Sequence, residues 1–418
     1  MTASPTARPP RSATWLAPYR PVLADPVLRT LLPGFAVSYL GDGMSAVAVS
    51  WLAIELAPPG QAGIWVALAV AAYTLPGAAG TVLFGRTMQG RSGARLTAWD
   101  ATLRAAALAA IPLAYAAGAL RPTLYVGLLA VSSLLHTWGS AGRYTLLAEV
   151  LPREHHLAGN ALLSTLAEAA TLLGPVIAGV LTASFGAVWV IGVDAMTFAV
   201  LAVSAYAALR RSPPPPDRPA PVARLGSLRA IRGDPRLLGL LALTFAFFFL
   251  YGPVQVALPV HVADDQHGSA MLLAAYWTSF GVGAVAGGLA TGHLRRWPLW
   301  PITIGIVVGW GVALMPVGLG APAAISVAAF GLGGLIYAPY LSTSMALFQG
   351  ALAPDRLPPV LATRSAILLL SSPVGAILGG PLVAAVGAQR TILASSLTTV
   401  VLGALAAAVV SGAHRTRR

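Results

Sequence analysis

Long apolar runs, separated by short breaks rich in proline, glycine or arginine, dominate the pattern of this chain. A helix rises about 1.5 Å per residue, so about 20 apolar residues span the hydrocarbon core of a bilayer. The runs predict an all-α integral membrane protein with twelve transmembrane helices. Their predicted ranges are 31–57, 62–86, 96–118, 122–148, 157–184, 187–209, 237–261, 269–292, 299–319, 322–350, 358–386 and 389–411.

One polar interruption, residues 210–236, is much longer than the others. Its four consecutive prolines predict a stiff, extended linker. Six predicted helices precede it and six follow, which predicts two pseudo-symmetric six-helix bundles. The predicted units are an N-terminal tail (1–30), a first bundle (31–209), the linker (210–236), a second bundle (237–411) and a basic C-terminal tail (412–418).

Composition excludes several classes of protein. Of 418 residues, 57% are hydrophobic and 9% are charged, whereas soluble proteins are about 25% charged. Lipid is therefore expected to cover most of the surface. The chain has no cysteine and no lysine. This excludes disulfides, thiolate metal sites and the lysine-containing phosphate loop of ATP-driven pumps. We expect no metal site, no cofactor and no catalytic residues.

All 26 basic residues are arginines, and their placement predicts the topology. The side of the tails and the linker carries 21 of them, whereas the opposite side has only Arg121 and Arg390. Positive charge marks the cytoplasmic side of membrane proteins. We therefore expect both termini in the cytoplasm and the chain in the bacterial cytoplasmic (inner) membrane. Because the arginines gather at the ends of apolar runs, the net charge of +13 favours the lipid bilayer, and not nucleic acid, as partner.

Three ionisable side chains lie deep within predicted helices. Asp42 is near the middle of the first apolar run, where a carboxylate costs about 2.5–3.5 kcal/mol on insertion scales. Glu168 in the fifth predicted helix and His136 in the fourth lie at comparable depths. These residues are candidates for binding protons or a cationic group. The alternative is structural, with neutral acids hydrogen-bonded to neighbouring helices and a histidine that serves only packing.

A second set of charges lies nearer the cytoplasmic ends. Asp100 and Arg143 are each about five residues from the cytoplasmic ends of the third and fourth predicted helices, which predicts an ion pair, and Arg104 is one turn from Asp100. Arg364 is the candidate for a matching role in the second bundle. Such a pair can gate a conformational change or clamp two helices in every state.

The second bundle has no acid in the middle of its predicted helices, but it has aromatic and amide side chains. These predict an apolar substrate pocket with a few polar anchors, although tyrosine and tryptophan also occur at ordinary membrane interfaces. The candidates for the substrate pocket are Tyr251, Gln255, Phe248, Trp277, Tyr337 and Tyr340.

Several short motifs resemble the major facilitator superfamily, and most of all its bacterial multidrug branch of macrolide-efflux and enterobactin-exporter-like proteins. They are SYLGDGMS (38–45), WDATLRA (99–105), AGRYTLLAEVLPREHHLAGNAL (141–162), LLGPVIAGVL (172–181) and VDAMTF (193–198). The resemblance implies a six-plus-six fold, and Gly174, Pro175 and Gly179 resemble an antiporter signature that bends a helix. The chain departs from the family at Gln89, where an aspartate is usual.

These features predict a secondary active transporter that works by alternating access, with no enzymatic activity. The expected activity is export of a small amphiphilic compound, such as a drug, a natural product or a siderophore, in exchange for protons. We expect a monomer. One alternative is an importer or flippase for a lipid or small metabolite. A membrane-embedded receptor or enzyme is a remoter alternative, because the sequence has neither a sizeable soluble domain nor a convergent catalytic set.

Overall fold

The computed structural model describes residues 19–88, 90–211, 233–291, 297–351 and 357–415. Within these ranges every regular element is a helix. Eleven helices of the described part are long and apolar enough to cross a membrane. A twelfth, α6 (Gly93–Ala116), has 24 residues but carries Arg95, Asp100 and Arg104. The predicted all-α membrane fold is therefore confirmed.

Each predicted transmembrane segment corresponds to one, two or three helices of the structure, and two further short helices, at residues 20–24 and 153–155, lie outside the predicted segments. In the first half these are α1 (Arg20–Ala24), α2 (Pro26–Leu56), α3 (Ala62–Thr74), α4 (Pro76–Leu83), α5 (Gly85–Met88), α6, α7 (Pro122–Ser133), α8 (His136–Val150), η3 (Arg153–His155), α9 (His156–Phe185) and α10 (Ala187–Leu209). In the second half they are α12 (Pro235–Val260), η4 (His261–Asp265), α13 (Ala270–Ala290), α14 (Leu299–Gly318), α15 (Ala323–Tyr337), α16 (Pro339–Ala351), α17 (Leu357–Val386) and α18 (Ala388–Arg415).

The chain becomes helical earlier than the predicted tail of residues 1–30 implies. Asp25 caps α2, because its carboxylate accepts hydrogen bonds from the backbone N–H groups of Val27 and Leu28. Pro26 occupies the first turn, where its missing N–H costs nothing. At the other end of the chain, α18 continues to Arg415, into the predicted tail. Most of the predicted linker lies outside the described residues, as does Gln89.

Three predicted helices are broken near their middles. The break between α3 and α4 precedes Pro76, and the break between α15 and α16 precedes Pro339. Proline has no N–H group to donate within a helix and clashes with the preceding turn, which explains both breaks. The break between α7 and α8 falls just before His136 and has no proline. These breaks lie beside the site described below.

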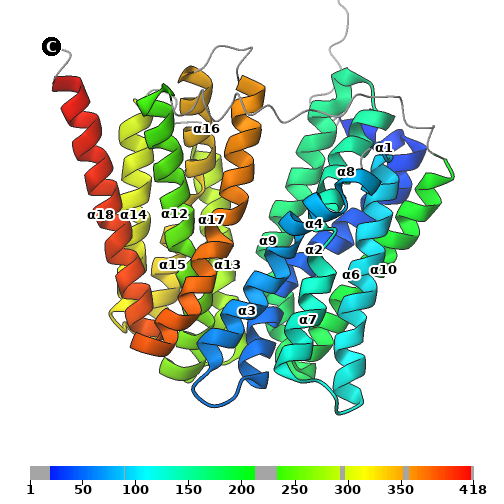
Figure 1. Cartoon of the computed structure of the whole chain (residues 1–418), viewed down its shortest axis with the longest axis horizontal. Coiled ribbons are helices and arrows are strands. Elements are labelled where there is room, and N and C mark those ends of the chain that lie inside the picture. Colours follow the sequence, from blue (N-terminus) through cyan, green and yellow to red (C-terminus); the bar gives the residue numbers. More distant parts are fainter. Residues whose placement is uncertain (1–18, 89, 212–232, 292–296, 352–356, 416–418) are drawn as a thin grey trace, which may run out of the picture.

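The helices form two bundles, one from each half of the chain (Figure 1). The starts of α1 and α12 and the ends of α10 and α18 lie at one end of the molecule, at the top of Figure 1, which we call the terminal side. The opposite end is the far side.

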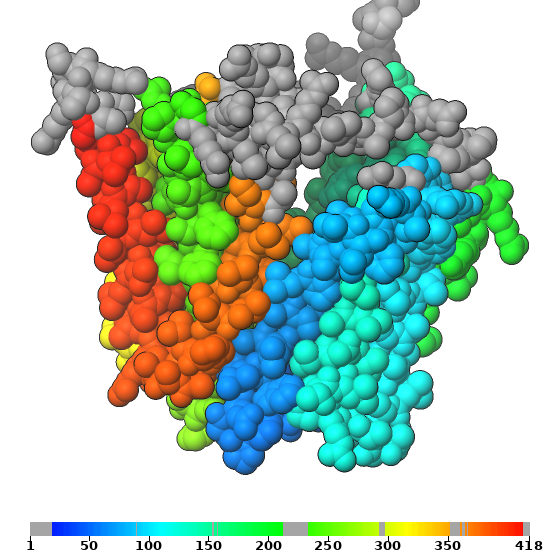
Figure 2. All heavy atoms as spheres, in the orientation of Figure 1, coloured from blue at the N-terminus to red at the C-terminus, as the bar shows by residue number. Residues whose placement is uncertain are grey.

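The bundles contact each other through α3 with α17 and α9 with α13. The contact between α3 and α17 is visible in Figure 2. An added Cβ at Gly63 would lie 2.5 Å from Val383 Cγ1, and one at Gly179 would lie 2.6 Å from Ala274 Cβ. Gly63 is the second residue of α3, which starts on the far side, and Gly179 is six residues from the far end of α9. These close contacts between the bundles therefore lie toward the far side.

Candidate functional site

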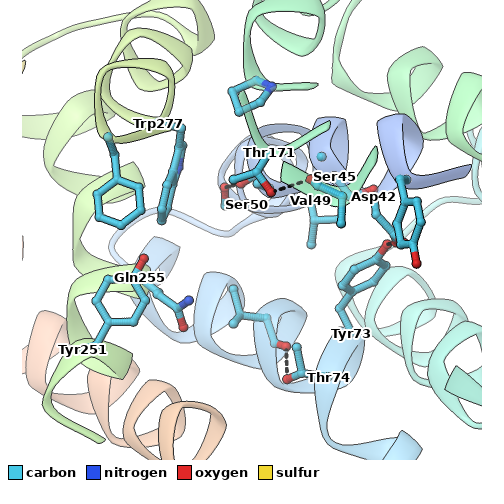
Figure 3. Close-up of a pocket in the computed structure, with 17 residues that line it drawn as sticks. Asp42, Ser45, Val49, Ser50, Tyr73, Thr74, Thr171, Tyr251, Gln255 and Trp277 are labelled. Atoms are coloured by element: carbon cyan, nitrogen blue, oxygen red, sulfur yellow. Dashed lines mark hydrogen bonds between the residues drawn. The ribbon is translucent and has the colours of Figure 1, made fainter. Parts of the chain in front are cut away.

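A cavity of 450 Å³ lies between the two bundles. The first bundle contributes α2, α3 and α9, and the second contributes α12 and α13 (Figure 3). Polar groups of α2 and α3 face aromatic rings of α12 and α13 across this space. The lining residues are Tyr39, Asp42, Gly43, Ser45, Ala46, Val49, Ser50, Val70, Tyr73, Thr74, Ala167, Thr171, Pro175, Tyr251, Gln255, Trp277 and Phe280.

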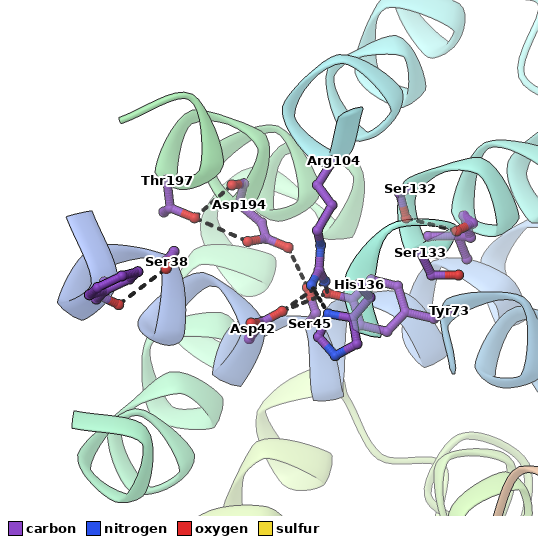
Figure 4. A network of polar contacts seen from close by, with 12 residues as sticks. Ser38, Asp42, Ser45, Tyr73, Arg104, Ser132, Ser133, His136, Asp194 and Thr197 are labelled. Atoms are coloured by element: carbon purple, nitrogen blue, oxygen red, sulfur yellow. Dashed lines mark hydrogen bonds and ion pairs between the residues drawn. The ribbon is translucent and has the colours of Figure 1, made fainter. Parts of the chain in front are cut away.

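Asp42 lies on the wall of the cavity and forms an ion pair with Arg104. Its Oδ1 atom is 2.8 Å from Nη2 of Arg104 and accepts a hydrogen bond of 3.1 Å from the hydroxyl of Tyr73 (Figure 4). The Asp42 side chain is 26% exposed, whereas that of Arg104 is 1% exposed. Its second oxygen, Oδ2, has no hydrogen-bond partner among the described residues. One oxygen thus holds the ion pair, and the other is left free.

Arg104 is the centre of this network. It donates from Nη2 to the Tyr73 hydroxyl at 2.6 Å and from Nη1 to Nδ1 of His136 at 2.7 Å. Its guanidinium carbon also lies 4.2 Å from the centre of the Phe198 ring, a cation–π distance. Arginine has no acceptor atom, so His136 Nδ1 must accept the hydrogen bond and carries no proton. His136 therefore holds Arg104 in place here. Its Nδ1 atom is occupied by this hydrogen bond and is not free to bind a proton, as the predicted proton relay would require.

Asp194 of α10 is a second carboxylate next to this network, and it is 1% exposed. Ser45 donates a hydrogen bond of 2.6 Å to Oδ2, and Thr197 donates one of 3.2 Å to Oδ1. α2 can approach this carboxylate only because residue 41 is glycine: an added Cβ there would lie 2.1 Å from Asp194 Oδ1. Asp194 is thus a buried contact between α2 and α10, and Ser45 links it to the cavity wall.

The predicted ion pair between Asp100 and Arg143 is not formed in this conformation. Both side chains are buried, but Asp100 Oδ1 and Arg143 Nε and Nη2 have no hydrogen-bond partner in the described ranges. The guanidinium of Arg143 is directed toward α2, where it lies 4.6 Å from the Tyr39 ring centre. α8 approaches Asp100 closely at Gly139. Of the buried arginines Arg104, Arg143 and Arg364, the one that pairs with a carboxylate of a described residue is Arg104, and its partner is Asp42.

Glu168 and Arg364 lie apart from this network. Glu168 is exposed on α9 and does not line the cavity, although Ala167 and Thr171 of the same helix do. Arg364 of α17 is buried and donates a hydrogen bond of 3.1 Å to the hydroxyl of Ser344. Within the part of the chain that the structure describes, Arg364 has no carboxylate partner.

The aromatic candidates divide into two groups. Tyr251, Gln255 and Trp277 line the cavity as predicted, and Gln255 Oε1 accepts a hydrogen bond of 2.8 Å from Ser372. The other group packs behind this wall. It consists of Phe248, Tyr337 and Tyr340, which contact Phe247 with ring centres 5.8, 5.7 and 4.5 Å away.

The predicted helix-bend motif makes three different contacts. Gly174 packs against the backbone of α2 at Gly43, since an added Cβ would lie 2.4 Å from the Gly43 carbonyl carbon. Pro175 lines the cavity. Gly179 contacts Ala274 of the other bundle. α9 remains one continuous helix across the motif.

The sequence interpretation missed Tyr73 and Ser45. A signal for Tyr73 was available, because it is a polar residue near the middle of the second predicted segment. Ser45 is three residues after Asp42, so both lie on one face of α2.

The chain matches the family model for the Major Facilitator Superfamily over residues 31–357. It is 25% identical over 390 residues to the multidrug efflux pump Tap of Mycobacterium tuberculosis, covering 88% of this chain and 89% of Tap. Among solved structures, the nucleoside transporter NupG has a TM-score of 0.69 at 14% identity, covering 91% of this chain and 98% of NupG. A bacterial homologue of the iron transporter ferroportin in an inward-facing state has a TM-score of 0.68 at 16% identity, with the same coverage. These solved structures share the fold, and the chain belongs to the Major Facilitator Superfamily of membrane transporters.

Proposed function

We propose that this transporter exports a small amphiphilic compound from the cytoplasm of a bacterium in exchange for protons. The observation that carries the proposal is Asp42, a partly exposed carboxylate in a cavity between two bundles of helices. A cavity between bundles can open alternately to either side when the bundles rock. A carboxylate on its wall can take up and release a proton during that cycle.

The free oxygen of Asp42 is the proposed site of proton binding. A proton from the cavity forms an O–H bond at Oδ2 and neutralises the carboxylate, so Arg104 loses its ionic partner. Asp100 and Asp194 also lie within Coulombic range of Arg104. The buried guanidinium can then move toward these carboxylates. Release of the proton from Oδ2 restores the ion pair with Asp42 and completes the cycle.

The opposite wall favours an amphiphilic substrate. Tyr251, Trp277 and Phe280 provide aromatic surface, and Gln255 provides an amide. The indole Nε1 of Trp277 is buried without a partner among the described residues, so this donor is unsatisfied in this conformation. Because Arg104 compensates the charge of Asp42, the cavity does not require a cationic substrate. An uncharged or weakly charged aromatic compound also fits these walls.

The arrangement of the bundles favours a state open toward the terminal side. The close contacts between bundles at Gly63 and Gly179 lie toward the far side. If the termini are cytoplasmic, as the arginine distribution predicts, this is an inward-facing state. The ferroportin homologue is described as inward-facing, and Tap as an efflux pump, which supports both the state and the direction.

Transport in reconstituted vesicles tests the proposal. Purified protein is placed in vesicles that contain either ethidium, a cation, or Nile red, an uncharged amphiphile, and a pH gradient is imposed. We expect the gradient to accelerate movement of at least one dye in the wild type but not in Asp42→Asn. A wild type that moves neither dye faster than protein-free vesicles would contradict the proposed substrate class. A variant as sensitive to the gradient as the wild type would contradict the role of Asp42.

A further inference from the structure

A second cavity, of 340 Å³, lies on the terminal side of the first bundle. It is lined by Pro26, Arg29 and Thr30 from the first turns of α2 and by Arg211, two residues after the end of α10. Arg211 Nη1 donates a hydrogen bond of 2.8 Å to the hydroxyl of Thr30. This contact brings two arginines from distant parts of the sequence to one cavity.

No described residue compensates the charge in this cavity. Neither Arg29 nor Arg211 forms an ion pair with a carboxylate in the described ranges. The acid next to α2, Asp25, accepts hydrogen bonds from the backbone of Val27 and Leu28. Guanidinium groups bind phosphate oxygens with paired hydrogen bonds. Two guanidinium groups beside a hydroxyl, with no acid among the described lining residues, match the chemistry of a phosphate group.

The depth of the cavity matches the headgroup region of a membrane. α10 has 23 residues, a length of about 34 Å, which is slightly more than the hydrocarbon core. Arg211 therefore lies where the helix leaves the hydrocarbon. Further into the membrane, Val203 and Tyr206 of α10 are 70% and 44% exposed, and Val37 of α2 is 38% exposed. Acyl chains can cover these apolar side chains while a phosphate occupies the cavity.

We propose that Arg29, Thr30 and Arg211 bind the phosphate of an anionic phospholipid. Basic cavities at the membrane surface attract such lipids, because each arginine contributes to the attraction. The lipid would bridge α2 and α10, the two helices that hold Asp42 and Asp194. This inference stands apart from the proposed transport activity, because its residues are on the surface and outside the central cavity.

Native mass spectrometry of the full-length protein tests the proposal. The probes are phosphatidylglycerol, phosphatidylcholine and inorganic phosphate, added separately at equal concentration. We compare the wild type with Arg29→Gln/Arg211→Gln and with the control Arg121→Gln/Arg390→Gln, which removes two exposed arginines on the far side. We expect the wild type and the control to retain phosphatidylglycerol in preference to phosphatidylcholine. The first variant should show about a tenfold loss of bound phosphatidylglycerol.

Three results would overturn the proposal. The first is equal retention of phosphatidylglycerol by both double variants. The second is no preference for phosphatidylglycerol over phosphatidylcholine in the wild type. The third is binding of inorganic phosphate that is lost in Arg29→Gln/Arg211→Gln, without preferential retention of phosphatidylglycerol, which would indicate a site for the free ion. If the Arg29→Gln/Arg211→Gln variant does not fold, Arg211→Gln alone replaces it, because Arg211 lies beyond the end of α10.

Discussion

Asp42 of α2 and Arg104 of α6 form an ion pair with a distance of 2.8 Å between Oδ1 and Nη2. The pair joins two helices inside one bundle, next to the cavity that separates the bundles. It is asymmetric, because the arginine is fully enclosed and the carboxylate is partly exposed. A proton can therefore reach the acid from the cavity without any movement of the arginine.

Loss of the arginine alone should harm the protein more than loss of the whole pair. Arg104→Gln leaves Asp42 without its cation, and breaking one side of a buried ion pair costs about 3 kcal/mol. Asp42→Asn/Arg104→Gln removes both charges and should recover most of that loss. Thermal unfolding of the detergent-purified variants measures this difference. Equal stability of the single and double variants would contradict the expected cost of leaving Asp42 without its cation.

His136 is expected to position Arg104, and not to carry the transported proton. His136→Gln keeps an acceptor for the Arg104 Nη1 hydrogen bond, whereas His136→Phe removes it. We expect the glutamine variant to transport with the pH profile of the wild type and the phenylalanine variant to be impaired. The measurement is the transport rate in vesicles over a range of pH. A glutamine variant whose pH profile is flat would restore the histidine as a proton carrier.

Gly41 is expected to be essential for the contact between α2 and α10. In Gly41→Ala the added Cβ would lie 2.1 Å from Asp194 Oδ1 and 2.3 Å from Thr197 Oγ1. Overpacking of this kind costs about 1–3 kcal/mol. Gly305→Ala in α14 is the matched control, because no atom lies within 4 Å of its added Cβ. Thermal unfolding should show a loss for Gly41→Ala only, and similar midpoints for both variants would contradict the close packing.

The sequence predicted the number and order of the helices because a bilayer imposes one length on every segment that crosses it. It also predicted Asp42, Tyr251, Gln255, Trp277 and Pro175 as residues of functional interest, and all five line the cavity. Each is a polar, aromatic or proline residue within an apolar helix. Residues of these kinds stand out within an apolar run, so they can be recognised from the sequence without a structure.

The partner of Asp42 could not be predicted in the same way. α2 is apolar around its whole circumference, so its sequence does not show which face meets α6. Depth counted from the terminal side was also misleading, because α2 begins at Pro26 and extends beyond the predicted start. Counted from the far side, Asp42 is 14 residues before Leu56 and Arg104 is 12 residues before Ala116. Their depths therefore agree, but only the packed structure shows that their side chains meet.

The central claim, that Asp42 couples transport to protons, is tested most directly by following protons during substrate movement. Vesicles are loaded with a trapped pH indicator and with the dye that the wild type transports fastest, and no pH gradient is imposed. Glu168→Gln is the control, because it also changes an acid into an amide but lies outside the Arg104 network. Downhill dye movement should change the internal pH in the wild type and in the Glu168→Gln control. Asp42→Asn should still move the dye, with no pH change beyond that of protein-free vesicles. If Asp42→Asn moves protons with the dye as the wild type does, Asp42 is not the coupling residue.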